Sequence, residues 1–73
     1  MDSMSFEELY YQVTMGSPMN SFLFSKGNIS GKGIGINPGP LDPSVSILTN
    51  TNETILIPYH DLGSWTIVNN AKE

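Results

Sequence analysis

His60 and Asp61 are neighbouring residues whose types suit acid–base chemistry. In a catalytic dyad the carboxylate orients the imidazole ring, and the ring activates a nucleophile. Residues adjacent in sequence seldom reach that geometry, and without a cysteine the nucleophile would have to be one of the serines. Other carboxylates, such as Asp42 and Glu53, are scattered over segments expected to be loops. We therefore interpret His60-Asp61 as a surface turn capped by Asp61, and we expect no enzymatic activity.

The glycine-rich stretch at residues 29–40, ISGKGIGINPGP, raises the question of a phosphate site. A P-loop needs G-x-x-x-x-G-K, then Ser or Thr, then a helix whose N-terminus faces the phosphate. Here the glycine spacing is one residue short, Gly33 stands where the hydroxyl belongs, and prolines follow. The dinucleotide fingerprint G-x-G-x-x-G also fails, because the third glycine comes too early. Both nucleotide motifs are excluded.

A strand explains this stretch better. In a strand, Gly31, Gly33 and Gly35 would line one face while Lys32, with the isoleucines that follow it, lines the other. Alternating glycines weaken a strand unless it bends sharply or something packs flat on the bare face. Three explanations stay open: a bend or internal packing (for example against the N-terminal helix), a second subunit, or a planar ligand. Lys32 would meet an anionic ligand or keep its face in solvent.

The aromatic residues Trp65, Tyr59 and Tyr11 are the remaining site candidates. Trp65 either completes the core against the isoleucines of the preceding strand or, like Tyr59, anchors an interface, since aromatic residues dominate binding hot spots. Tyr11 lies outside the apolar face of the expected N-terminal helix. It is therefore either an ordinary exposed tyrosine or part of an interface.

Composition excludes several classes of protein. The chain of 73 residues has no cysteine, one histidine and no arginine, with a net charge of −4. A disulfide and a thiolate or ordinary zinc site are therefore excluded, and we expect neither metal nor cofactor. Nucleic-acid binding is not expected, because such proteins need a basic surface. Small domains without a disulfide or a structural metal often gain stability from a partner subunit, so we expect a homo-oligomer.

No segment is apolar for the ~20 residues that a bilayer helix needs. The N-terminal sequence MDSMSFEE is acidic and lacks the pattern of a signal peptide. We therefore expect no membrane association and a cytoplasmic protein.

A single domain over residues 1–73 is expected, with one helix at about 5–15. Ser5 and Glu8 fit a capping box, and Phe6, Leu9, Tyr10 and Val13 recur on one helix face. Strands are expected at about 20–26, 28–36, 44–49, 54–58 and 64–68. Tight turns are expected at residues 26–28, where Gly27 tolerates a positive φ, and at residues 50–53, where two asparagines do so. The fold class is mainly β: a short N-terminal helix followed by a five-stranded, strongly bent antiparallel sheet or a small barrel.

Residues 44–68, SVSILTNTNETILIPYHDLGSWTIV, resemble small β-barrels of the SH3, Sm-like and PRC-barrel kind. These barrels have a hairpin whose second strand ends in a hydrophobic-Pro pair, here Ile57-Pro58. A 3₁₀ turn and a short last strand follow, here at Asp61-Leu62 and from Trp65 onward. The resemblance implies a small barrel behind an N-terminal helix, and assembly into rings or dimers through edge strands.

Two functions remain open. The first is a non-catalytic, homo-oligomeric interaction module that binds or inhibits a protein partner. The second is a binder of a small anionic ligand, which sequesters a nucleotide-type signal at a subunit interface through the glycine stretch, Lys32, and Tyr59 or Trp65. The short, acidic, asparagine-rich composition is also typical of phage or mobile-element accessory proteins.

Overall fold

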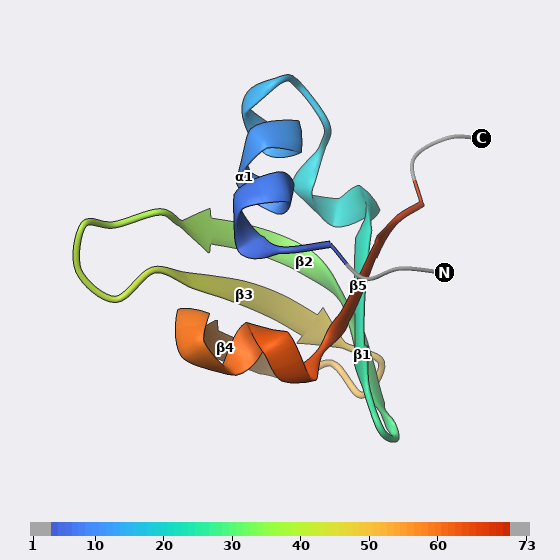
Figure 1. Ribbon diagram of the computed structural model, residues 1–73. Helices are drawn as coiled ribbons and strands as arrows, with labels where there is room; N and C mark the ends of the chain where they lie inside the picture. The colour runs from blue at the N-terminus through green and yellow to red at the C-terminus, as the bar shows by residue number, and fades with distance from the viewer. Residues whose placement is uncertain (1–3, 71–73) are drawn as a thin grey trace.

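The computed structural model describes residues 4–70 as a helix followed by a five-stranded antiparallel sheet (Figure 1). The mainly β fold class with an N-terminal helix is thereby confirmed. The strand order is β4-β3-β2-β1-β5, and the sheet is bent but not closed into a barrel. The elements in chain order are α1 (Phe6–Thr14), η1 (Met19–Ser21), β1 (Phe22–Lys26), β2 (Ile29–Asn37), β3 (Ser44–Thr49), β4 (Thr54–Pro58), η2 (Tyr59–Ser64) and β5 (Thr66–Asn69).

Helix α1 begins and ends where its capping residues require. The Ser5 side chain accepts a hydrogen bond from the Glu8 backbone N–H at 3.2 Å, which satisfies one of the free amides of the first turn. At the other end Gly16 has a φ of +114°, a conformation that glycine adopts without strain. A helix of 9 residues would not be stable alone in water. It is held by Leu9, which is fully buried in the core.

Two strands begin two residues later than the pattern predicts. Residues 19–21 form the 3₁₀ helix η1, in which the Ser21 N–H donates to the Pro18 carbonyl, so β1 starts at Phe22 instead of residue 20. The 3₁₀ helix η2 runs to Ser64, and the Trp65 N–H still donates to Leu62. Strand β5 therefore starts at Thr66 instead of residue 64.

The alternation expected along the glycine-rich strand is wrong beyond Gly33. A β-bulge shifts the pairing of β2 with β3, so that Gly33 faces Ile47, Gly35 faces Ser46 and Ile36 faces Val45. The extra residue in a bulge moves all later side chains to the other face of the strand. Gly35 consequently lies on the opposite face from Gly33, and Ile36 packs against the core.

Internal packing explains the two glycines before the bulge. A Cβ on Gly31 would lie 2.5 Å from the Leu48 carbonyl oxygen, because the β3 backbone passes directly against it. A Cβ on Gly33 would lie 2.7 Å from the Met19 side chain and 3.2 Å from the Phe24 ring. The bare face of the strand is therefore filled by the protein's own β3 and η1 segments.

The sheet has one covered face and one open face. Helix α1 and η2 lie over the inner face (Figure 1), where they contribute Leu9 and Leu62 to the core. The other core residues are Phe22, Phe24, Val45, Ile47, Ile57, Trp65 and Ile67. The outer face carries exposed side chains such as Leu23 and Lys32, which pair across β1 and β2. No helix within residues 4–70 is long and apolar enough to cross a membrane.

Candidate functional site

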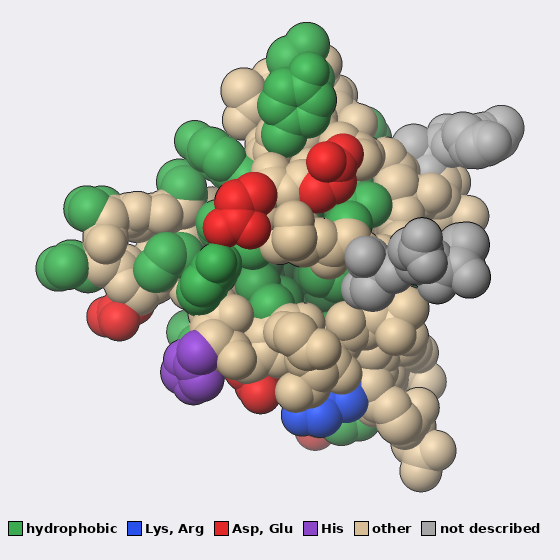
Figure 2. Space-filling view, in the orientation of Figure 1, with side chains coloured by type: hydrophobic (Ala, Val, Ile, Leu, Met, Phe, Trp, Pro, Cys, Tyr) green, Lys and Arg blue, Asp and Glu red, His purple; other side chains and the backbone are tan. Residues whose placement is uncertain are grey.

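The principal candidate site is a groove between α1, the loop at residues 38–43 and η2, which we name the aromatic groove. Its volume is about 480 Å³. It is lined by Phe6, Glu7, Tyr10, Tyr11, Thr14, Pro38, Pro43 and Tyr59. Figure 2 shows hydrophobic side chains gathered on this side of the molecule, with acidic side chains beside them.

Packing between rings shapes the groove floor. The Phe6 and Tyr10 rings stack with centroids 6.3 Å apart and an angle of 6° between their planes. The Tyr59 ring meets Phe6 edge to face, with centroids 5.4 Å apart. Both geometries are favourable for aromatic pairs, so they hold the rings in a fixed arrangement. The groove is therefore largely formed before any partner arrives.

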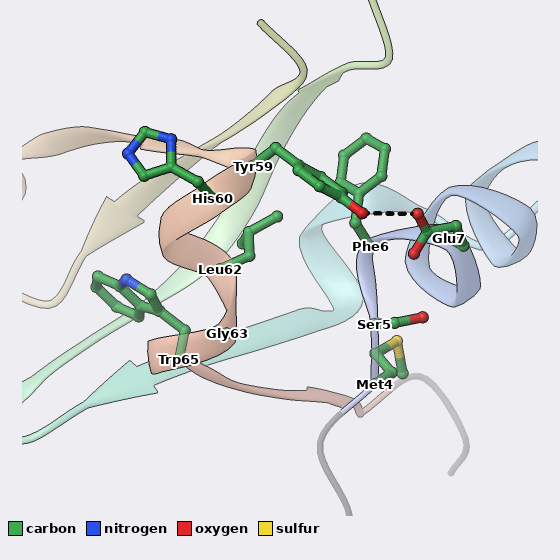
Figure 3. A pocket seen from close by; sticks show the side chains of 9 residues that line it. All are labelled: Met4, Ser5, Phe6, Glu7, Tyr59, His60, Leu62, Gly63 and Trp65. Carbon is green, nitrogen blue, oxygen red and sulfur yellow. Dashed lines mark hydrogen bonds between the residues drawn. The ribbon is translucent and has the colours of Figure 1, made fainter.

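A hydrogen bond joins η2 to α1 at one end of the groove. The Tyr59 hydroxyl donates to Oε2 of Glu7 at 2.9 Å, and Figure 3 shows the two side chains aimed at one another beside Phe6. This hydrogen bond, followed by the negative charge of Glu7, raises the pKa of Tyr59 above its ordinary value of 10.0. The neutral tyrosine is thus favoured in the folded state. Its stabilising effect is present below pH 10.0 and is lost as the pH rises through the raised pKa.

Replacing Glu7 with glutamine is expected to lower the pKa of Tyr59, because the amide accepts a hydrogen bond without carrying a charge. Absorbance of the tyrosinates at alkaline pH measures this shift, and Tyr59→Phe identifies the step that belongs to Tyr59. Glu53→Gln removes an exposed acid at the opposite end of β4 from Tyr59 and is the matched control. An identical Tyr59 titration in Glu7→Gln and wild type would contradict the geometry in Figure 3.

A second hollow, of about 490 Å³, lies on the other side of the Tyr59–Glu7 hydrogen bond (Figure 3). Its lining includes His60 and Trp65, two of the residues singled out from the sequence. Trp65 is only 6% exposed and belongs to the core, with the Lys26 ammonium 5.9 Å from the ring centroid. The core interpretation of Trp65 therefore agrees with its burial. His60 is exposed on η2.

Lys32 and the glycines lie elsewhere. Gly31 and Lys32 line a hollow of about 560 Å³ on the outer face of the sheet, together with polar residues that include Ser30 and Asn50. Gly33 is buried against Met19 and Phe24. The outer face points away from α1 and η2, so one copy of the chain does not bring Lys32 together with Tyr59 or Trp65.

The charges of the aromatic groove are negative. The elements that form it carry Glu7 and Glu8 on α1, Asp42 in the loop and Asp61 on η2, and none of them carries a lysine. Within residues 4–70 no three His, Asp or Glu side chains gather as a group that could hold a metal ion. The groove therefore suits a neutral or cationic ligand better than an anionic one.

Two members of the groove, Tyr11 and Tyr59, are candidates from the sequence alone, but their proximity is not evident there. Phe6 and Tyr10 share the apolar helix face that the spacing predicts, but Tyr10 is 42% exposed and stacks on Phe6 at the surface. The available signal was an excess of aromatic residues in α1, namely three in 9 residues, which is more than one buried stripe needs.

No protein-family model, curated protein or solved structure matches this chain.

Proposed function

We propose that the protein is a non-catalytic interaction module that binds a segment of a partner protein in the aromatic groove. The observation that carries the proposal is the exposure of three tyrosines around one groove: Tyr10 is 42%, Tyr11 60% and Tyr59 46% exposed. Tyrosine side chains supply large, rigid contact area at low entropic cost and dominate binding hot spots. Burial of these rings by a partner would supply the affinity.

The charge of the groove selects the kind of segment. Glu7 lies within the groove, and Glu8, Asp42 and Asp61 belong to the elements around it. A lysine or arginine of the partner would meet carboxylates at the rim and aromatic faces within the groove, where cation–π contacts add to the attraction. We therefore expect an extended segment that combines apolar and basic residues. Binding of this kind would inhibit a partner whose own active surface is basic.

A random-peptide display library, selected on the full-length protein, tests this function. We expect selected peptides to be enriched in basic and apolar residues, and to lose about tenfold or more in affinity towards Tyr11→Ser. Glu7→Gln should weaken the basic peptides by a smaller factor, because it removes one charge and keeps the hydrogen-bond acceptor for Tyr59. Ile29→Ser and Glu53→Gln are the matched controls, since they change an exposed isoleucine and an exposed acid that lie outside the elements forming the groove.

Selected peptides that bind Tyr11→Ser and Glu7→Gln as tightly as wild type would refute the groove as the binding site. Peptides enriched in acidic residues and dependent on Lys32 would instead favour the second candidate function.

The second candidate is a binder of a small anionic ligand, and the hollow around Lys32 favours it. Lys32 is the one cation on the outer face among residues 4–70. Leu23 and Leu48 lie directly opposite it, and the hollow also has hydroxyl and amide side chains in its lining. Stacking of such a ligand on Tyr59 or Trp65 would require a second copy, because those residues lie on the other side of the sheet. A nucleotide mixture that raises the melting temperature of wild type and not of Lys32→Ala would support this function.

A further inference from the structure

Strand β4 forms one edge of the open sheet and carries no charged residue. Its sequence, Thr-Ile-Leu-Ile-Pro, lies at the end of the strand order, and Leu56 is 64% exposed. Edge strands of monomeric proteins are commonly protected by charges, bulges or a covering segment, because their free backbone groups pair with other chains. The opposite edge, at β5, has such a cover: the Met4 N–H donates to the Ile67 carbonyl at 3.2 Å.

The pairing of β4 with β3 fixes which backbone groups face outward. The Thr49 N–H donates to the Glu53 carbonyl, and the Tyr59 N–H donates to the Pro43 carbonyl, each at 2.8 Å. Hydrogen-bonded and non-hydrogen-bonded pairs alternate along an antiparallel ladder, so the intervening residues Ile55 and Ile57 also bond to β3. The N–H and C=O groups of Thr54 and Leu56, and the C=O of Pro58, therefore point away from the sheet.

We propose that a second copy of the chain pairs with this edge, β4 against β4, antiparallel about a twofold axis at Leu56. In this register each Leu56 N–H donates to the Leu56 carbonyl of the other copy. Each Thr54 N–H donates to the Pro58 carbonyl of the other copy, so every outward donor of the strand finds an acceptor. Proline has no N–H to leave unsatisfied, and its place at the end of β4 therefore fits this pairing.

The side chains agree with the same register. Leu56 stands on the outer face beside Ser46, and across the twofold axis it would meet the other Leu56 directly. Such a contact removes an exposed leucine from water on both copies. It also joins two sheets into one and leaves both aromatic grooves, which do not include β4, free for a partner.

Cysteine cross-linking tests the register, because the natural chain has no cysteine and a single introduced thiol reacts only with its symmetry mate. In the proposed dimer the two Leu56 Cα atoms are about 5.5 Å apart, within the range of a disulfide. The two Thr54 Cα atoms are about 14 Å apart, four residues along the strand pair, and cannot be bridged. We expect Leu56→Cys to form a covalent dimer under mild oxidation at least about tenfold faster than Thr54→Cys. Equal rates for the two variants would overturn the register.

Sedimentation equilibrium of the full chain tests the interface. We expect wild type and Leu41→Lys to form a dimer, because Leu41 is an exposed loop leucine and serves as the matched control. Leu56→Lys should raise the dissociation constant by at least about 100-fold, since both copies lose a buried leucine and like charges then face each other. A wild type that remains monomeric, or a dimer unaffected by Leu56→Lys, would overturn the proposal. The circular dichroism spectrum of Leu56→Lys should match that of wild type, which shows that the variant is folded. If Leu56→Lys is misfolded, the comparison of the two cysteine variants decides the proposal.

Discussion

Replacing Gly31 with alanine is expected to abolish most of the stability of the protein. The added Cβ would lie 2.5 Å from the Leu48 carbonyl oxygen and 2.9 Å from the Thr49 Cα, which are backbone atoms of the central pairing between β2 and β3. A rotamer change cannot relieve a contact with backbone, so the two strands must separate. We expect a loss of about 3 kcal/mol or more, at the upper end of overpacking effects. A chain of this length has only several kcal/mol of stability in total.

Gly35→Ala is the matched control for that prediction. It makes the same change in the same strand, where nothing lies within 4 Å of the new Cβ and the φ is not in the left-handed region. Urea unfolding measures both variants. The free energy of unfolding of Gly35→Ala should lie within about 0.5 kcal/mol of wild type, whereas that of Gly31→Ala should not. Similar values for the two variants would contradict the close approach of β3 to Gly31 and the bulge that separates the two glycines.

Trp65→Ala is expected to lower the free energy of unfolding by about 3–5 kcal/mol, as truncation of a buried aromatic side chain does. The indole is 6% exposed and belongs to the same core cluster as Leu62 and Ile67. Thermal or urea unfolding measures the effect.

Tyr11→Ala is the control for Trp65→Ala, because Tyr11 is 60% exposed and its loss should change stability by less than about 0.5 kcal/mol. The pair separates structural from functional aromatic residues: Trp65→Ala should unfold the protein, and Tyr11→Ala should weaken peptide binding in a folded protein. A stable Trp65→Ala that fails to bind would instead make Trp65 an interface anchor.

Local patterns predicted much of the fold. The capping residues Ser5 and Glu8 placed the start of α1, and the Ser5 hydroxyl makes the expected hydrogen bond. The turn chemistry was equally local: Gly27 has a φ of +61° between β1 and β2, and Asn52 has a φ of +66° between β3 and β4. These conformations depend on residues a few positions apart, which is why a single sequence was enough to predict them.

The β-bulge in β2 could not be predicted from local sequence patterns. Gly31, Gly33 and Gly35 alternate without a break in the sequence, yet the pairing with β3 shifts between Gly33 and Gly35. The shift depends on which strand lies opposite and on Met19, whose backbone and side chain pack against Gly33. Neither contact leaves a periodic signal in the strand itself.

The candidate site divides in the same way. The residue types that could do chemistry are evident from the sequence: no cysteine or arginine, one histidine, a net charge of −4 and aromatic residues in the N-terminal helix and before the last strand. Their arrangement became visible in the folded chain, where a hydrogen bond joins Tyr59 to Glu7, 52 positions apart, and Lys32 lies on the other face of the sheet. The physical reason is that residue type and local conformation depend on near neighbours along the chain. The gathering of distant side chains depends on the bend of the sheet and on the face that buries the core.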